Sequence, residues 1–227
     1  MKNDDISQLI KSGIRSVSAS FPFMASVSQA WCEYESHIQQ ERVNAFFLDF
    51  ASRLDKVENH LKEIKNSEQN KELVSLLERT IDSVRKETTE YKRSIFSLLL
   101  ANCVVEYDAL EIETKLELVD LLDRLSLTDI QLLRQFSHEG NLRVETLGNF
   151  FNAPWTEESD RKFGEIIFSL SKLEARGLIS QTQDNIGGKI WERKQDHWIN
   201  RWKFKHFEIL PYGRLFLKLI GRNIAKT

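Results

Sequence analysis

The chain has 227 residues, of which 41% are hydrophobic and 29% charged, which is the composition of a folded globular protein rather than a disordered one. It holds only 3 Pro and 9 Gly, and this shortage favours long helices over a fold of short strands and turns. The formal net charge of -2 excludes a uniformly basic protein that coats nucleic acid, while a local basic patch stays compatible with it.

The N-terminal residues and the cysteines predict a cytoplasmic protein. Asp4 and Asp5 stand where a signal peptide would carry positive charge. The least charged stretch nearby, residues 16–31, is too short and too rich in Ser to span a bilayer. The two cysteines, Cys32 and Cys103, form no CxxC pair, and we expect both to be reduced, buried and structural.

The first periodic segment has apolar residues at steps of 3, 4 and 7, which predicts a helix with one apolar stripe. The stripe consists of Ile10, Ile14, Val17, Phe21, Met24 and Trp31. Pro22 lies inside it and predicts a kink or a break near Phe21. We expect a bent core helix. The alternative is an amphipathic segment, Gly13–Trp31, that meets a membrane or a partner, although its polar face holds Ser and Gln rather than Lys and Arg.

Two more stripes alternate regularly between steps of 4 and 3 residues. The first contains Val43, Phe47, Phe50, Leu54, Val57, Leu61 and Ile64, and the second contains Leu77, Ile81, Val84, Thr88, Tyr91, Ile95 and Leu98. The polar run between them, residues 65–71, predicts a turn. Together they predict an antiparallel helical hairpin or bundle with coiled-coil-like packing. We expect the first stripe to serve self-association or binding to a protein partner.

The end of the N-terminal half is strongly apolar. Residues 96–105 are apolar on nearly all sides, so we expect the centre of the N-terminal core there. A Leu-rich helix should follow over residues 106–125. These elements form the first predicted domain, residues 1–124, whose 16 basic and 22 acidic residues give a net charge of -6.

The sequence after residue 124 predicts shorter helices. Ser126 or Thr128 suits the N-cap of a helix that runs to Phe136. A turn at residues 138–141, a short helix at 144–151 and a longer helix at 158–176 should follow. Phe163, Ile166, Ile167, Leu170 and Leu173 form the apolar stripe of the longer helix.

Two strands and a final helix complete the predicted elements. Gly177 stands where a left-handed C-cap residue belongs. Residues 178–182 and 203–210 alternate as strands, and Pro211 suits the first turn of a closing helix.

The order helix, helix, helix, strand, long hairpin, strand, helix resembles the winged helix-turn-helix superfamily. The stretch LSKLEARGLISQT, Leu170–Thr182, is similar to the end of a recognition helix that enters the first wing strand. Phe207–Ile220 is similar to the return strand and closing helix, with Leu210 in place of the usual Thr before Pro211. The resemblance implies a second domain, residues 125–227, with a small β-hairpin wing. The expected fold class is therefore mainly α, a helical hairpin or bundle followed by a winged helix.

A second resemblance covers more of the chain. Lys92–Val104 and Leu125–Phe136, followed by the winged-helix-like tail, resemble the Abi-alpha proteins, which are bacterial proteins associated with abortive infection against phage. The resemblance implies a regulatory or phage-defence role, and it carries over no catalytic residue.

The second half is basic, and its charge is concentrated. Residues 125–227 hold 16 basic and 12 acidic residues, a net of +4, and residues 187–206 alone hold six basic and two acidic ones, also +4. Basic residues interleaved with Trp suit phosphate contact and base stacking. The expected nucleic-acid-binding residues are Lys189, Arg193, Lys194, Arg201, Lys203, Lys205, Trp191, Trp198 and Trp202 in the wing, with Arg161, Lys162 and Lys172 on the recognition helix.

The recognition helix weakens this expectation in its first turns. Glu157, Glu158, Asp160 and Glu165 crowd the part that normally approaches base edges. We therefore expect the wing to dominate any nucleic-acid contact and the sequence specificity to be low. The alternative is that the Trp residues cover the helical domain, so that the chain is a protein–protein interaction module that binds no nucleic acid.

The sequence predicts no enzyme. It has no Gly-rich phosphate loop, no HExxH and no GxSxG, and its five His show no metal-ligand spacing. We therefore expect no cofactor and no metal. A third functional reading is a membrane-acting defence effector that uses the segment Gly13–Trp31.

Overall fold

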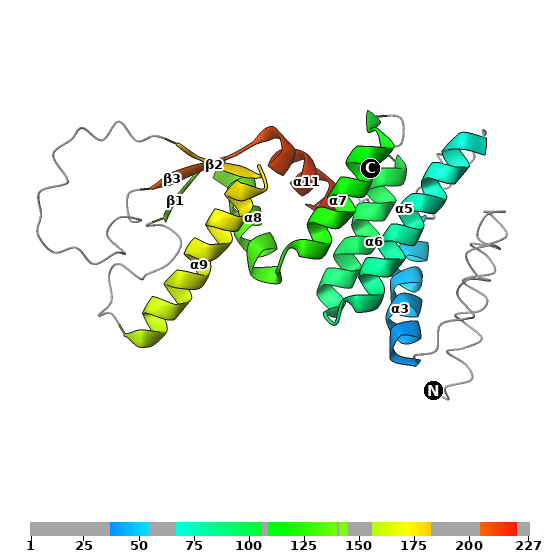
Figure 1. Ribbon diagram of the computed structural model, residues 1–227, viewed down its shortest axis with the longest axis horizontal. Coiled ribbons are helices and arrows are strands. Elements are labelled where there is room, and N and C mark those ends of the chain that lie inside the picture. Colours follow the sequence, from blue (N-terminus) through cyan, green and yellow to red (C-terminus); the bar gives the residue numbers. More distant parts are fainter. Residues whose placement is uncertain are drawn as a thin grey trace, which may run out of the picture. The chain divides into compact units, whose positions relative to one another are not determined.

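The computed structural model describes residues 37–54, 67–105, 109–139, 141–144, 156–182 and 205–221 (Figure 1). This part of the chain is mainly helical, with one small antiparallel sheet. The chain forms two compact units, residues 1–124 together with 219–227, and residues 125–218.

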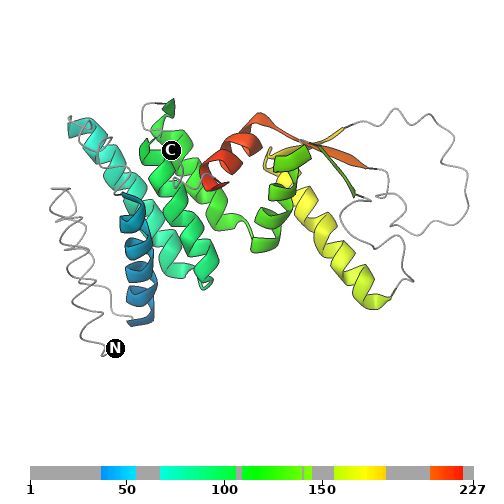
Figure 2. The same ribbon diagram turned by 180° about the vertical axis from the view of Figure 1, so that it is seen from behind.

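The described part of the first unit is built on α3 (His37–Leu54), α5 (Ser67–Lys86), α6 (Glu90–Val105) and α7 (Ile112–Arg124). The helix α3 packs on α6 and α5, and α5 packs on α7 and α6 (Figure 2). In α6 every residue from Ile95 to Val104 is buried, which confirms the core predicted for residues 96–105. Asn102 of α6 donates a hydrogen bond from Nδ2 to the carbonyl oxygen of Leu219 at 2.5 Å.

Cys103 is buried in the middle of this core. Burial raises the pKa of its thiol to about 12, so the thiolate that reacts with oxidants and metals is scarce at neutral pH. This agrees with the predicted structural role. Cys32 and the first predicted stripe, Ile10 to Trp31, lie outside the described residues.

The helix α3 presents a broad aromatic face rather than a narrow seam. Val43, Phe47 and Phe50 of the predicted stripe are buried, and Phe46 is only 1% exposed. The ring centroid of Phe46 lies 5.4 Å from that of Phe47 and 6.0 Å from that of Phe50. Three phenyl rings within five residues therefore fill the contact of α3 with its neighbours, which a strict 3.5-residue pattern does not capture.

The third predicted stripe is divided between two helices, so the single helix expected from Leu77 to Leu98 is wrong. Residues 87–89 form a tight turn between α5 and α6. Glu87 Oε1 accepts a hydrogen bond from Thr89 N at 2.8 Å. Arg93 Nη1 donates to the carbonyl oxygens of Glu87 at 3.1 Å and Thr88 at 2.9 Å. The Arg93 side chain therefore satisfies carbonyl oxygens that would accept backbone hydrogen bonds in a continuous helix. The adjacent β-branched residues Thr88 and Thr89 also disfavour a helix at this place.

Two other boundaries differ from the prediction. The polar run at residues 65–71 was predicted as a turn, but the residues from Ser67 onward begin α5, because Glu, Gln and Lys are good helix formers without any apolar signal. The Leu-rich helix predicted from residue 106 begins at Ile112 as α7. Tyr91 of the predicted stripe lies in the first turn of α6 and is 45% exposed, whereas Ile95 and Leu98 of the same stripe are buried.

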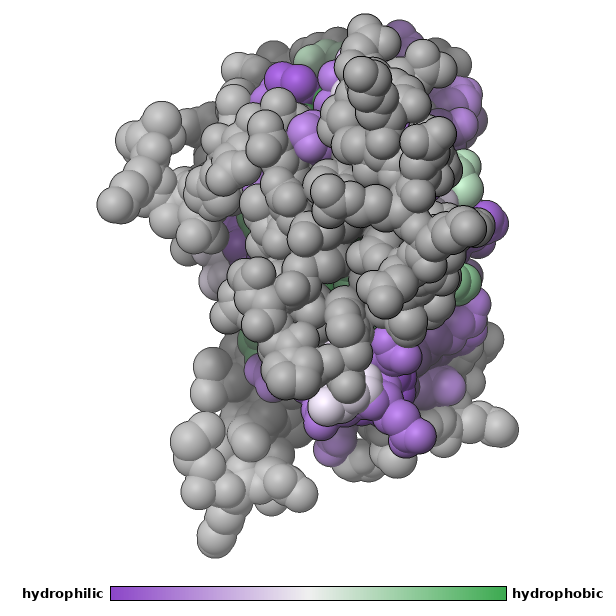
Figure 3. Space-filling view, turned by 90° about the vertical axis from the view of Figure 1, so that its left-hand side faces the viewer, coloured by the Kyte–Doolittle hydropathy of each residue, from purple (hydrophilic) through white to green (hydrophobic). Residues whose placement is uncertain are grey.

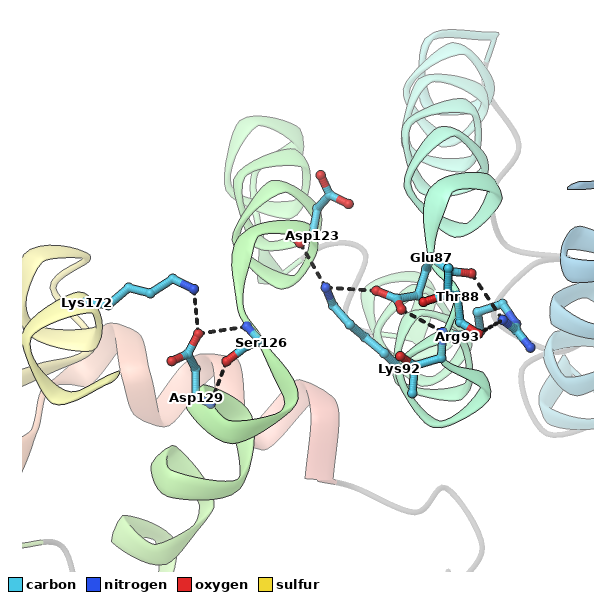
Figure 4. A network of polar contacts seen from close by, with 9 residues as sticks. Glu87, Thr88, Lys92, Arg93, Asp123, Ser126, Asp129 and Lys172 are labelled. Carbon is cyan, nitrogen blue, oxygen red and sulfur yellow. Dashed lines mark hydrogen bonds and ion pairs between the residues drawn. The ribbon is translucent and has the colours of Figure 1, made fainter. Parts of the chain in front are cut away.

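A buried lysine joins three elements of the first unit (Figure 4). Lys92 Nζ lies 3.0 Å from Glu87 Oε2 and donates to the carbonyl oxygen of Asp123, in the last turn of α7, at 2.9 Å. Burial tends to raise the pKa of Glu87, but hydrogen bonds from Thr89 and Lys92 outweigh it and hold the pKa below its usual value. Lys92 thus neutralises Glu87 and also satisfies a carbonyl at a helix end, where a cation is favourable.

The second unit contains α8 (Leu127–Glu139), β1 (Asn141–Arg143), α9 (Glu157–Ala175), β2 (Ile179–Thr182), β3 (His206–Ile209) and the first part of α11 (Pro211–Gly221). The antiparallel sheet has the order β1-β3-β2, with Phe207 of β3 paired to Leu142 and Gln181. The two predicted strands are confirmed with shorter bounds, and β1 was not predicted. The short helix predicted at residues 144–151 falls on residues that, apart from Val144, lie outside the described part.

The predicted caps of this unit are present. Ser126 is the residue that caps α8, because its Oγ accepts from Asp129 N at 3.2 Å while Asp129 Oδ2 accepts from Ser126 N at 2.7 Å. This reciprocal pair satisfies two backbone donors at the helix start. Gly177 has φ 66° and ends α9 in the left-handed region, as predicted. Pro211 begins α11, also as predicted.

Candidate nucleic-acid interface

The helix α9 is the central element of the candidate site. Thr156 caps it in an extended conformation and accepts a hydrogen bond on Oγ1 from Ser159 N at 3.2 Å. Its inward residues Phe163, Leu170 and Leu173 are fully buried, as predicted, and the acidic residues of its first turn suit the positive end of the helix dipole. The helix is therefore stabilised by its N-cap, by the acidic residues of its first turn and by its buried apolar face. Its opposite face, called the open face below, is exposed to solvent.

The open face of α9 carries more acidic than basic side chains. Its exposed residues between positions 157 and 171 are Glu157, Glu158, Arg161, Lys162, Glu165, Phe168 and Ser171. Lys162 Nζ lies 2.6 Å from Glu158 Oε1, and this pairing holds the pKa of Glu158 below its usual value. Figure 3 faces the side on which Figure 1 draws α9 and the sheet, and the described residues visible there are mostly hydrophilic.

Lys172, predicted to contact nucleic acid, has a partner inside the unit (Figure 4). Its Nζ lies 2.6 Å from Asp129 Oδ2, and the Asp129 side chain is only 1% exposed. Burial tends to raise the pKa of Asp129, but hydrogen bonds from Lys172, Ser126 and Ser169 outweigh it and hold the pKa below its usual value. The pair ties α9 to the start of α8, so Lys172 contributes no uncompensated positive charge to the surface.

The strands on either side of the basic segment, β2 and β3, pair with each other. Thr182 of β2 pairs with His206 of β3, and Thr182 Oγ1 donates to the carbonyl oxygen of His206 at 3.2 Å. The carbonyl oxygen of Lys205 accepts from Val144 N at 3.1 Å, and the Lys205 side chain is half-buried. The other predicted wing residues lie outside the described part: Lys189, Trp191, Arg193, Lys194, Trp198, Arg201, Trp202 and Lys203.

The residues predicted for self-association have a different position from the one expected. Val43, Phe47 and Phe50 are at most 6% exposed within the chain itself, since α3 packs on α5 and α6. In this structure they are core residues that a partner does not reach. The Leu54 side chain, together with Val57, Leu61 and Ile64, lies outside the described part.

Phe168 is a surface residue that the sequence analysis missed. It is 71% exposed, more than any other large hydrophobic side chain among the described residues. One signal was available, because Phe168 lies about 100° around the helix from Ile167 and about 140–160° from the other residues of the inward stripe.

Neither a metal site nor a membrane span is found in the described ranges. These ranges hold no group of three or more His, Cys, Asp or Glu side chains suited to a metal ion. Each helix within them is too short or too polar to cross a bilayer. Comparison with models of protein families gives no match, and neither do comparisons with curated proteins and with solved structures.

Proposed function

We propose that residues 125–218 form a winged-helix domain whose basic, Trp-rich segment, residues 187–206, contacts nucleic acid. The observation that carries the proposal is that this segment has an excess of basic residues, whereas α9 has none. The segment has six basic and two acidic residues, whereas α9 has three basic residues, two of them neutralised by Glu158 and Asp129. Phosphate attraction therefore acts on the segment rather than on the helix.

The order of the elements supports the winged-helix part of the proposal. A helix that ends at Gly177 leads directly into β2, and β3 returns antiparallel to β2 before α11. Because Thr182 and His206 are paired, the segment between them leaves and rejoins the sheet at the same end.

We expect this contact to be of low sequence specificity. The exposed Glu157, Glu158 and Glu165 of α9 repel phosphates and keep that helix from base edges. Contacts to phosphate and stacking on Trp position a nucleic acid without reading its sequence.

The test is binding to mixed-sequence duplex DNA over a range of salt concentrations. The wild type should lose affinity steeply as salt rises, and the double variant Lys194→Gln with Lys203→Gln should lower the slope by roughly two units, since each lost phosphate contact removes about 0.9. Lys205 is left unchanged because it is half-buried beside β3.

The matched control is the double variant Arg161→Gln with Lys162→Gln on α9, which removes the same charge. Its salt slope should stay close to that of the wild type. Absence of binding at low salt would contradict the proposal and favour a protein–protein interaction module. An equal loss in both double variants would mean that α9 is part of the contact.

The Abi-alpha resemblance extends the proposal to a role in phage defence. The stretch Lys92–Val104 that carries the resemblance lies in α6, the buried centre of the first unit. We expect bacteria that express the chain to lower the plating efficiency of at least one phage from a diverse panel. The variant Lys194→Gln with Lys203→Gln should lose this protection, whereas Arg161→Gln with Lys162→Gln should keep it. Equal plating with and without the chain across the panel would contradict this role.

A further inference from the structure

We propose that α11 links the stability of the two units, so that the first unit is fully stable only while the sheet of the second unit is intact. The residues that carry this inference form the last turn of α11, Leu219, Ile220 and Gly221, called the α11 end below. The inference goes beyond the nucleic-acid contact proposed for residues 187–206 and does not depend on it.

The α11 end is part of the first unit, although it follows the second unit in the chain. Leu219 is 1% exposed and Ile220 is 0% exposed. The carbonyl oxygen of Leu219 accepts a hydrogen bond from Asn102 Nδ2 of α6 at 2.5 Å. Because every residue from Ile95 to Val104 is buried, α6 needs cover on all its sides, and at Asn102 the α11 end supplies it.

The contact between Asn102 and the α11 end is polar, and its loss has a cost for the first unit. Asn102 is only 4% exposed. The carbonyl that it binds lies in the last turn of α11, where the helix itself has no backbone donor for it. Without this contact a buried amide and a helix-end carbonyl would each lose a hydrogen-bond partner. The first unit is therefore less stable when the α11 end is absent.

The start of α11 is held by the second unit. Leu210 N donates a hydrogen bond to the carbonyl oxygen of Leu178 at 3.0 Å, and a Cβ at Gly213 would overlap the same oxygen. Arg214 Nε donates to the carbonyl oxygen of Ile209 at 3.4 Å. Leu178 directly precedes β2 and Ile209 ends β3, so these contacts depend on the pairing of the two strands.

The helix α11 is too short to be stable by itself. It has 11 residues, and isolated helices of fewer than about 12–15 residues are marginal in water. Its helical structure therefore depends on contacts at its start, in the second unit, and at its end, in the first unit. When β2 and β3 separate, α11 loses the contacts at its start, and the α11 end leaves α6 more readily.

The coupling is expected to act in both directions, because the same helix stabilises both units. A change that destabilises the sheet makes the opening of α6 more frequent, and a ligand that stabilises the second unit makes it rarer. The other passage of the chain between the units has no shared helix, since α7 ends at Arg124 and α8 begins at Leu127.

The test is hydrogen exchange of the full chain, measured in α6 and in β3 by mass spectrometry. Phe207→Ala truncates a side chain of β3 that is 1% exposed, and it should speed exchange in β3 and also in residues 95–104, by about tenfold or more. Phe168→Ala is the matched control, because the same truncation at an exposed position of α9 should leave α6 unchanged. Exchange in α6 at the wild-type rate while β3 opens faster would overturn the proposal.

A double variant tests whether the effect passes through α11. Ile220→Ala weakens the α11 end and should by itself speed exchange in α6. Combined with Phe207→Ala, it should raise the exchange rate of α6 by less than the product of the two separate effects, since both act on the same contact. The full product would mean that the second unit acts on the first by another path, and would overturn the role of α11.

Cys103 allows a second measurement next to Asn102. Its thiol is buried in α6, so a thiol reagent reaches it only when the first unit opens. In a Cys32→Ser background, Phe207→Ala should speed the labelling of Cys103 by a factor similar to that of hydrogen exchange, and Phe168→Ala should not. Labelling at the wild-type rate would overturn the proposal, even where Phe207→Ala has unfolded the second unit altogether.

Discussion

Replacing Asp129 with alanine is expected to lower the free energy of unfolding of the second unit by about 3–5 kcal/mol. The Asp129 carboxylate is 1% exposed and accepts hydrogen bonds from Lys172 Nζ at 2.6 Å and Ser126 N at 2.7 Å. Alanine removes the carboxylate that accepts from Ser126 N at the start of α8, and it leaves the Lys172 ammonium, 24% exposed, without its partner. The measurement is urea unfolding followed by circular dichroism, with the wild type as reference.

Two further variants separate the charge from the cap. Asp129→Asn keeps an acceptor for Ser126 N but removes the ion pair, and Lys172→Met keeps most of the packing. Each should cost less than Asp129→Ala, and their double variant should cost less than the sum of the two, since they remove one shared interaction. Strict additivity would contradict the coupling between α8 and α9.

The same variants have an expected pH dependence. The pKa of Asp129 is lower in the folded protein than its ordinary value of 3.8, so its contribution is present above about pH 4 and is lost as pH falls through the folded value. Glu87 in the first unit is shifted in the same direction. Wild-type stability should therefore fall on acidification, and the fall should be smaller in Asp129→Ala. An unchanged acid dependence in that variant would contradict the assignment.

The sequence predicted those elements in which local chemistry and packing agree. The Ser126 hydroxyl can accept a hydrogen bond from a backbone N–H at a helix start, and Gly177 tolerates the positive φ that ends a helix. These two residue types therefore mark helix ends directly in the sequence. The continuous apolar run in α6 likewise has no stable place outside a core. In these places a short stretch of sequence contains the physical cause of the structure.

The helix break at residues 87–89 could not be predicted in the same way. Thr88 continues the 3.5-residue pattern, so the pattern runs in phase through a turn that is held by the side chains of Glu87 and Arg93. The strand β1, with three residues, exists because β3 pairs with it, and its own residues show no strand period.

The sequence was enough to predict the charge of the candidate site, but not that Lys172 forms an ion pair with Asp129. The acidic start of α9 is visible in the sequence, whereas the burial of Asp129, 43 residues before Lys172, is a result of the tertiary fold. A lysine on a helix thus looks available to phosphate until the packing of α8 on α9 is known. Phe168 falls outside the apolar stripe of α9 in the sequence, but the stripe alone did not draw attention to it as an exposed residue.

Gly213→Ala is expected to destabilise the second unit by about 1–3 kcal/mol. A Cβ at this position would overlap the carbonyl oxygen of Leu178 and would lie 2.9 Å from Ile209 Cγ1. The Leu178 oxygen already accepts a hydrogen bond from Leu210 N at 3.0 Å, so it cannot move away without weakening the junction of β2, β3 and α11. Since Gly213 lies in a helix, alanine would otherwise be favoured by roughly 1 kcal/mol, and the clash must exceed this gain.

The control is Gly164→Ala in α9, where the added methyl group meets no atom within 4 Å and the helix should gain about 0.5–1 kcal/mol. Thermal and urea unfolding of the two variants should therefore change in opposite directions. Equal stabilisation by both substitutions would mean that α11 can shift away from Leu178 at little cost. In that case the close approach at Gly213 would not be what fixes α11 against the sheet.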